Sequence, residues 1–284
     1  MTYRSLLVYL SNDTLCEQRT QAAITLARRL DAHLVGLAPT GLVNLPMAME
    51  PMGSLGEFSM LAYNTLRDLA TEAAEQFRTS CLAAGLRSHE AVVDEADKAA
   101  SLIHHAHCSD LSILSQADPA AFGQAEAQRV LEQVLLHSAR PTLLLPYTGA
   151  GTSGSLGRSA LVAWDDSREA ARALSDALPL LRQAEQVNVL SFSEGAVSSD
   201  TTEALAKRLG ALQRWLMWQG VSAEVHAEST EVGVGDAILS RASDLGADLI
   251  VMGAYGHTRF TERVLGGATR RLLGSMTAPV VMSH

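Results

Sequence analysis

The sequence predicts an α/β protein made of two tandem copies of one domain, each with a mainly parallel sheet covered by helices. Short apolar runs alternate with helix-length amphipathic segments, which is the order of βαβ units. The whole series occurs twice along the 284 residues. The composition agrees, because the chain is 47% hydrophobic but only 5% aromatic, and small aliphatic residues suit helices that pack on parallel strands.

The internal repeat sets the domain boundaries. "RSLLVYLSND" at 4–13 aligns with "RSALVAWDDS" at 158–167, and "CSDLSILSQ" at 108–116 aligns with "GADLIVMGA" at 246–254. The Gly/Ser/Thr-rich stretch between the copies has no periodicity and is typical of a flexible linker. The prediction is therefore a domain at 1–147, a linker at 148–157 and a second domain at 158–284.

Expected strands and helices alternate along the whole second copy. Apolar residues recur on one face of the segment after the first strand, which indicates an amphipathic helix, and Gly220 is placed to end the next helix. The expected strands are 159–164, 186–192, 222–230, 247–253 and 279–283, and the expected helices are 167–184, 201–220, 235–246 and 267–276.

The first copy differs by an insertion at 39–60, about twenty residues longer than the matching part of the second copy. Its methionines, Met47, Met49, Met52 and Met60, suit an adaptable apolar lid or a partner surface. A loop that folds back on its own domain or on a dimer mate is the alternative.

Charge and cysteine content limit the class of protein. The net charge of −9 argues against a nucleic-acid partner, because phosphate contacts need clustered Lys and Arg. Three cysteines form an odd set with no disulfide spacing, and no apolar run is long enough for a membrane span. We expect a soluble cytoplasmic protein that binds neither nucleic acid nor membrane.

Four glycines, Gly253, Gly256, Gly266 and Gly267, lie between the fourth strand and the last helix of the second copy. Glycine at a strand end lets the backbone approach a ligand, and free N–H groups at a helix start favour phosphate. An ordinary glycine-rich loop is the competing interpretation. The Walker pattern is absent from the sequence, so a phosphate here would be held chiefly by main-chain donors.

The stretch "GAYGHTRFTERVLGG" at 253–267 resembles the G-x2-G-x9-G-[S/T] pattern of the universal stress protein family, and the whole chain is similar to a tandem member. The resemblance implies two Rossmann-like domains of the adenine nucleotide alpha hydrolase-like type, each with a five-stranded sheet. It also implies ATP, or AMP or ADP, as ligand, with a divalent metal such as Mg. The residues expected at the nucleotide are Asp165, Gly253, Gly256, His257, Arg259, Gly266, Gly267 and Ala268.

The resemblance has two departures. Gly267 stands where the pattern has Ser or Thr, which removes a hydroxyl donor but keeps a backbone N–H. In the first copy the four glycine positions become Ser115, Asp118, Gln128 and Arg129, and Ser11 replaces Asp165. The first domain is therefore expected to be a degenerate copy without a site, and the chain to bind at most one nucleotide.

The other polar clusters of the sequence do not indicate a metal site or a catalytic site. His104, His107 and Cys108 share a helix face but lack a fourth ligand, so a solvated helix end is expected rather than a metal site. Arg270 and Arg271 follow the glycine loop and are candidates for a ligand contact. The sequence shows no catalytic constellation, which favours a nucleotide-binding regulatory protein in stress response, by the resemblance, over a ligand-free scaffold or a slow ATP hydrolase.

The last strand of each copy lies at a sheet edge in this topology, and an exposed edge needs a partner. In dimers of the family these edges meet. The two halves are therefore expected to pair as an intramolecular pseudo-dimer, and a further homodimer is also expected.

Overall fold

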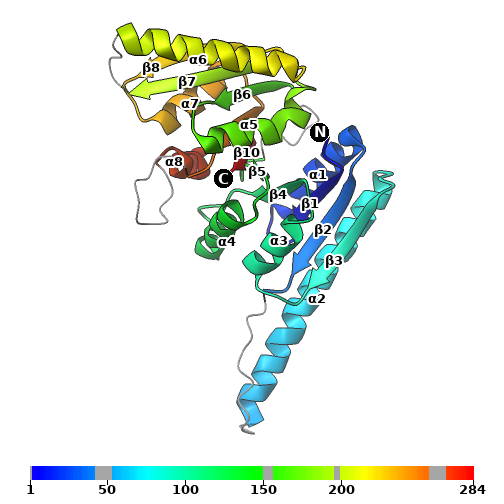
Figure 1. Ribbon diagram of the computed structural model, residues 1–284. Coiled ribbons are helices and arrows are strands. Elements are labelled where there is room, and N and C mark those ends of the chain that lie inside the picture. The colour runs from blue at the N-terminus through cyan, green and yellow to red at the C-terminus, as the bar shows by residue number, and fades with distance from the viewer. Residues whose placement is uncertain (1, 42–52, 150–155, 195–198, 256–266) are drawn as a thin grey trace.

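The computed structural model describes residues 2–41, 53–149, 156–194, 199–255 and 267–284, and it is drawn in Figure 1. The N-terminal domain contains β1 (Ser5–Tyr9), α1 (Cys16–Leu30), β2 (His33–Pro39), α2 (Gly53–Ala83), β3 (His89–Asp94), α3 (Lys98–Ala106), β4 (Leu111–Ser115), α4 (Gln124–His137) and β5 (Thr142–Leu145). The C-terminal domain contains β6 (Ser159–Ala163), α5 (Arg168–Leu181), β7 (Gln186–Glu194), α6 (Ser199–Trp218), β8 (Glu224–Thr230), α7 (Val234–Asp244), β9 (Leu249–Gly253), α8 (Gly267–Ser275) and β10 (Val280–Ser283).

All ten of these strands form one sheet in the order β3-β2-β1-β4-β5-β10-β9-β6-β7-β8. The pairs within each domain are parallel, and the two domains join where β5 and β10 pair antiparallel, with Leu143 opposite Val281. The predicted α/β class is confirmed. The terminal strands meet as expected, because each offers its edge to the other.

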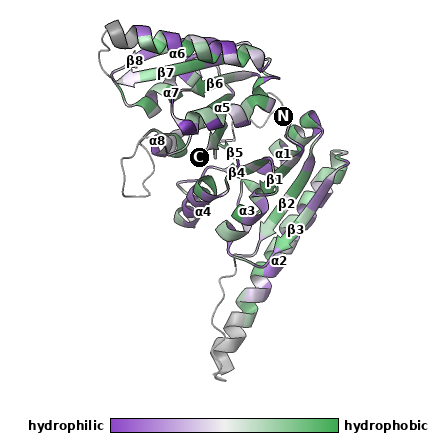
Figure 2. Ribbon diagram, viewed as in Figure 1, coloured by the Kyte–Doolittle hydropathy of each residue, from purple (hydrophilic) through white to green (hydrophobic). Residues whose placement is uncertain are grey.

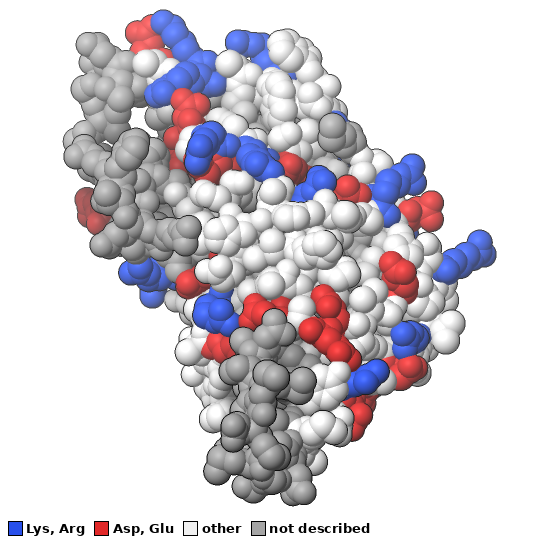
Figure 3. Space-filling model, turned by 60° about the horizontal axis from the view of Figure 1, so that its bottom comes forward, with Lys and Arg blue, Asp and Glu red and all other residues white. Residues whose placement is uncertain are grey.

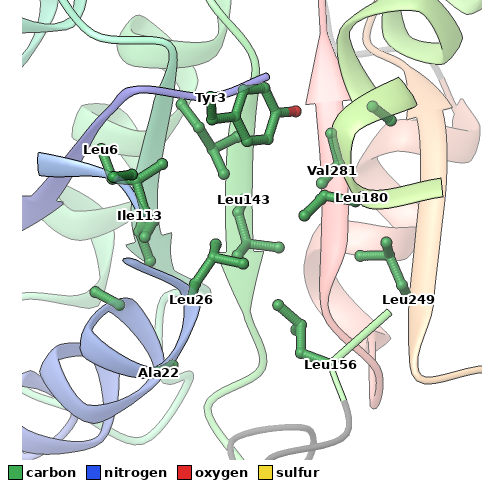
Figure 4. Packing of buried hydrophobic residues seen from close by; sticks show 14 of the residues in the cluster. Tyr3, Leu6, Ala22, Leu26, Ile113, Leu143, Leu156, Leu180, Leu249 and Val281 are labelled. Carbon is green, nitrogen blue, oxygen red and sulfur yellow. The ribbon is translucent and has the colours of Figure 1, made fainter. Parts of the chain in front are cut away.

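Helices cover both faces of the sheet, and each face has its own core. One core packs α1, α2, α5 and α6 against the sheet, and the other packs α3, α4, α7 and α8. Figure 2 shows the apolar strands between the more mixed helices. The first core runs across the domain junction, where Leu143, Leu180 and Val281 are buried together with Tyr3 (Figure 4). The Tyr3 hydroxyl donates to the Asp176 carbonyl oxygen at 2.6 Å.

One detail of the repeat is preserved at the start of the first strand of each domain. Asp110 Oδ2 accepts the backbone N–H groups of Arg4 and Ser5 at 2.7 and 2.9 Å. Asp248, at the same place in the second copy, accepts those of Arg158 and Ser159 at 3.3 and 3.0 Å. Each aspartate therefore satisfies backbone donors that a strand end would otherwise leave unpaired.

The insertion at 39–60 differs from the expectation of a loop. Residues 53–60 form the first two turns of α2, a helix of 31 residues whose N-terminal part projects away from the sheet (Figure 1). Met60 and Leu61 on this part are each 65% exposed. Met47, Met49 and Met52 lie outside the described residues.

Candidate functional site

The strand order of the C-terminal domain places one crevice at the carboxyl end of β6. The strand β6 pairs with β7 on one side and β9 on the other, so the chain leaves its carboxyl end between two crossovers that run in opposite directions. Ligands of open α/β sheets bind at such switch points. The segments that meet there are 164–167 after β6 and 253–255 at the end of β9.

Asp165 lies on the surface beside the start of α5. Its Oδ1 accepts from the backbone N–H of Ser167 at 3.1 Å and from the Ser167 hydroxyl at 2.5 Å. Ser167 is the N-cap, because its Oγ accepts from the backbone N–H of Ala170 at 3.1 Å. Asp165 therefore holds the capping residue in place and presents its carboxylate at the predicted ligand crevice.

Gly253 has a different role from the one expected. A Cβ on this residue would lie 2.7 Å from the Ala170 backbone nitrogen, 2.7 Å from the Glu169 carbonyl carbon and 2.8 Å from the Glu169 Cβ. Its φ is not among the positive values of the chain. The expectation of a positive φ at Gly253 is wrong, and this glycine lets α5 pack directly on the end of β9. A ligand contact at Gly253 stays a prediction.

The two ends of the glycine stretch lie together. The backbone N–H of Tyr255 donates to the Thr269 hydroxyl at 3.4 Å, which joins the residues after β9 to the first turn of α8. Tyr255 has φ of 66°, a left-handed conformation that turns the chain sharply. Gly256, His257, Arg259 and Gly266 lie outside the described residues.

The helix α8 begins at Gly267, as the sequence predicts, and Ala268 follows in its first turn. Gly267 is exposed, and a Cβ there would meet no atom within 4 Å. The N–H groups of the first turn have no intrahelical acceptor and carry the positive end of the helix dipole. These residues suit an anionic group at the loop, and no aspartate or glutamate lies in this turn of α8.

The two arginines after the loop have separate surroundings. Arg271 Nε donates to Asp236 Oδ1 at 2.6 Å, which ties α8 to the first turn of α7. A Cβ on Gly235 would lie 2.8 Å from the Arg271 Cβ, so α7 and α8 pack closely here. Arg270 is exposed. Both arginines are exposed, but Arg271 has a structural partner in Asp236.

A tryptophan-lined cavity beside Asp166 was not anticipated from the sequence. It has a volume of about 400 Å³ and lies between α5 and α6, with Trp164 and Trp215 in its wall. At its edge, Arg208 donates to Asp166 Oδ2 at 2.8 Å. The available signal was Trp164 itself, since an indole at the end of the first strand is adjacent to the predicted ligand residue Asp165.

The N-terminal domain replaces these features by other contacts. Gln128 and Arg129 lie in the second turn of α4, which begins at Gln124, so they do not stand at the helix start. These two residues therefore do not occupy the place that Gly266 and Gly267 have before α8. Ser11 and Ser115, the counterparts of Asp165 and Gly253, both accept hydrogen bonds from Arg19, at 2.6 and 2.8 Å.

The histidine cluster at the end of α3 serves local contacts. The rings of His104 and His105 meet edge to face, with their centroids 5.5 Å apart. A His107 ring nitrogen lies 3.3 Å from the His137 carbonyl oxygen. Cys108 is exposed. Within the described ranges, no three His, Cys, Asp or Glu side chains are grouped so that they could hold a metal ion.

The surface and the helices add two general observations. On the face shown in Figure 3, acidic and basic side chains are interspersed rather than gathered into a basic field. In the part of the chain that the structure describes, no helix combines the length and apolar character that crossing a membrane requires.

Comparison with known proteins gives a family match for the second domain and structural matches for the whole chain. The universal stress protein family model matches residues 158–284. A search of curated proteins gave no match. Among solved structures, a universal stress protein from Archaeoglobus fulgidus DSM 4304 covers 98% of this chain and 97% of its own, with 17% identity and a TM-score of 0.68.

Two structures from Pseudomonas aeruginosa are similar over the full length. A putative universal stress protein from strain UCBPP-PA14 covers 99% of this chain and 93% of its own, with 17% identity and a TM-score of 0.61. A functionally unknown protein from strain PAO1 covers 99% and 92%, with 16% identity and a TM-score of 0.60. The family model therefore matches the second domain, and the chain as a whole has the fold of these full-length structures.

Proposed function

We propose that the C-terminal domain binds an adenine nucleotide, ATP or AMP, and that the protein acts in stress response as a nucleotide-dependent regulatory protein rather than as an enzyme. The observation that carries this proposal is the hydrogen bond that joins the two ends of the glycine stretch at 253–267. Tyr255 and Thr269 are hydrogen bonded at 3.4 Å, so the segment that matches the family pattern begins and ends beside the N-terminus of α8.

The chemistry of this corner suits a phosphate chain. The first turn of α8 offers backbone donors and the positive end of a dipole, and its first residue, Gly267, leaves the approach open. Asp165 stands at the neighbouring strand end and would accept hydrogen bonds from the nucleoside. A divalent cation such as Mg²⁺ would accompany the nucleotide and be held chiefly by its phosphate oxygens.

Regulation would follow from occupancy of this site. The base of the stretch touches the other domain, because the Tyr255 hydroxyl donates to the Glu132 carbonyl oxygen of α4 at 3.5 Å. A ligand bound beside Tyr255 would therefore bias a contact between the domains.

Titration calorimetry with ATP and with AMP tests the proposal, and the expected stoichiometry is one nucleotide per chain. Gly267→Ser restores the hydroxyl of the family pattern in an open position, and Gly267→Ala is its matched control. A hydroxyl donor to a charged phosphate is worth about 1.5 kcal/mol or more, so the serine variant should bind ATP roughly tenfold more tightly than the alanine variant. Equal affinities for the two variants would contradict the site.

A ligand-free scaffold is the second candidate. It is favoured by the projecting part of α2, where Met60 and Leu61 are each 65% exposed, because exposed apolar residues suit a protein contact. A thermal shift assay separates the two functions. A rise of the midpoint with ATP supports nucleotide binding, while no rise at saturating ATP supports the scaffold.

A further inference from the structure

The N-terminal domain contains a cavity of about 300 Å³ at the carboxyl ends of β1 and β4. The strand β1 pairs with β2 on one side and β4 on the other, so this is the switch point of the first domain. The loop 11–15 and the loop 117–123 lie on its walls together with the first turn of α4. Its volume is at the lower end of the range for small-molecule sites, which begins at about 300 Å³.

The strand end beside the cavity has other contacts than the one at Gly253. The counterpart of that glycine is Ser115, whose hydroxyl accepts from Arg19 at 2.8 Å. Arg19 is 1% exposed, and its guanidinium also donates to the Tyr9 carbonyl oxygen at 2.6 Å and to the Ser11 hydroxyl at 2.6 Å. The arginine side chain thus fills the space under the two strand ends and forms part of the cavity floor.

The charged side chains around the cavity disfavour a phosphate ligand. Arg19 lies 3.6 Å from Asp13, and Lys98 lies 3.2 Å from Glu126, so both cations of the lining already face carboxylates. Asp118 adds a third carboxylate. The lining therefore has two cations and three carboxylates, and an added anion would meet net negative charge.

Hydrogen-bonding capacity remains at the rim. Asn12 and Gln124 are exposed, and within the described structure neither side chain makes a hydrogen bond. Amide and carboxylate side chains can bind pairs of hydroxyl groups, since they offer both donors and acceptors. Phe122 also lines the cavity and is fully exposed, so a flat apolar surface stands beside these polar groups.

We propose that this cavity binds an uncharged molecule with neighbouring hydroxyl groups, of the size of a monosaccharide or a nucleoside. The hydroxyls bind Asn12, Gln124 and Asp118, and the less polar face of the molecule lies against Phe122. The two sources of this chemistry are a free sugar and the ribose of a nucleoside. The site is separate from the nucleotide site proposed for the C-terminal domain and does not depend on it.

The α4 helix provides a matched pair of variants. Ala127 and Ala125 are both exposed residues of this helix, but only Ala127 lines the cavity. Ala127→Leu adds a side chain that fills the cavity, and Ala125→Leu adds the same side chain outside it. Phe122→Ala removes the exposed ring with no loss of core packing. Circular dichroism and urea midpoints would show that each variant is folded.

The experiment titrates adenosine, D-ribose and AMP into the full-length protein and its variants by ligand-observed NMR and calorimetry. At least one uncharged probe should bind the wild type. Its affinity should be at least tenfold lower for Ala127→Leu and for Phe122→Ala, and unchanged for Ala125→Leu. AMP binding that depends on Ala127 should be at least tenfold weaker than that of adenosine. Which uncharged probe binds identifies the source as sugar or nucleoside.

Three results would overturn the proposal. The first is no Ala127-sensitive binding of either uncharged probe at millimolar concentration. The second is equal weakening by Ala125→Leu, which would place the effect on the helix rather than the cavity. The third is AMP bound at the Ala127-sensitive site as tightly as adenosine, because the carboxylates of the lining would then have no effect on charge selection.

Discussion

Replacement of Gly253 by alanine separates two explanations of a glycine that matches the family pattern. The new Cβ would lie 2.7–2.8 Å from backbone and Cβ atoms of Glu169 and Ala170. These atoms belong to the first turn of α5 and cannot rotate away, so α5 must shift from β9. Overpacking of this kind costs about 1–3 kcal/mol, against a gain of about 0.4–1 kcal/mol from the lower entropy of the unfolded chain. A net loss of roughly 1–2 kcal/mol is expected.

Gly267→Ala is the control for this substitution. A Cβ at Gly267 meets no atom within 4 Å and the residue begins α8, so alanine there should leave the free energy of unfolding unchanged or raise it by up to about 1 kcal/mol.

Urea unfolding followed by tryptophan fluorescence measures both variants, because Trp164 and Trp215 lie in the same domain. If Gly253→Ala is within about 0.5 kcal/mol of Gly267→Ala, the packing explanation is refuted. The glycine would then have to be explained by ligand approach.

Three further predictions concern buried groups. The Gln116 side chain donates to the Leu273 carbonyl oxygen at 2.8 Å and accepts from the Tyr147 backbone N–H. Gln116→Leu should therefore lower the free energy of unfolding by about 1–3 kcal/mol. An unchanged urea midpoint would contradict this. Burial raises the pKa of the Cys81 thiol to about 11, so iodoacetamide followed by mass spectrometry should modify exposed Cys108 in the folded protein and Cys81 only in urea. Burial also raises the pKa of the Asp176 carboxyl, so its ionised form opposes folding above that pKa, and stability is recovered as pH falls through it. Asp176→Asn should therefore raise the urea midpoint at about pH 7 and weaken the increase of that midpoint as the pH falls through the raised pKa, and a lower midpoint at neutral pH would refute this sign.

The elements themselves were largely predictable, because they depend on local periodicity. The strand expected at 159–164 is β6 at Ser159–Ala163, and the helix expected at 267–276 is α8 at Gly267–Ser275. The exposed edges of the last strands and the family resemblance also predicted that these strands of the two halves would meet, as β5 and β10 do. The exception was the start of α2. Two helical turns begin at Gly53, within the methionine-rich insertion, and the sequence pattern did not predict them.

The candidate site was predictable only in part. The pattern located Gly253 and Gly267 but could not show that one touches α5 backbone while the other has open space, since that depends on the distance between a helix and a strand about eighty residues apart in sequence. Arg19 gave no signal of burial. Its partners come from Tyr9, Ser11 and Ser115, and only the folded sheet brings these residues to one guanidinium.

The sequence by itself determined the duplicated α/β architecture, because alternation of apolar runs and helical periods is written locally and occurs twice. It also located the glycine stretch that one copy has and the other lacks. The tertiary structure alone decided how each copy packs the end of its fourth strand. In the second domain a glycine admits α5 to the sheet, and in the first a serine and a buried arginine leave a cavity, because packing distances and charge partners are set by residues far apart in the chain.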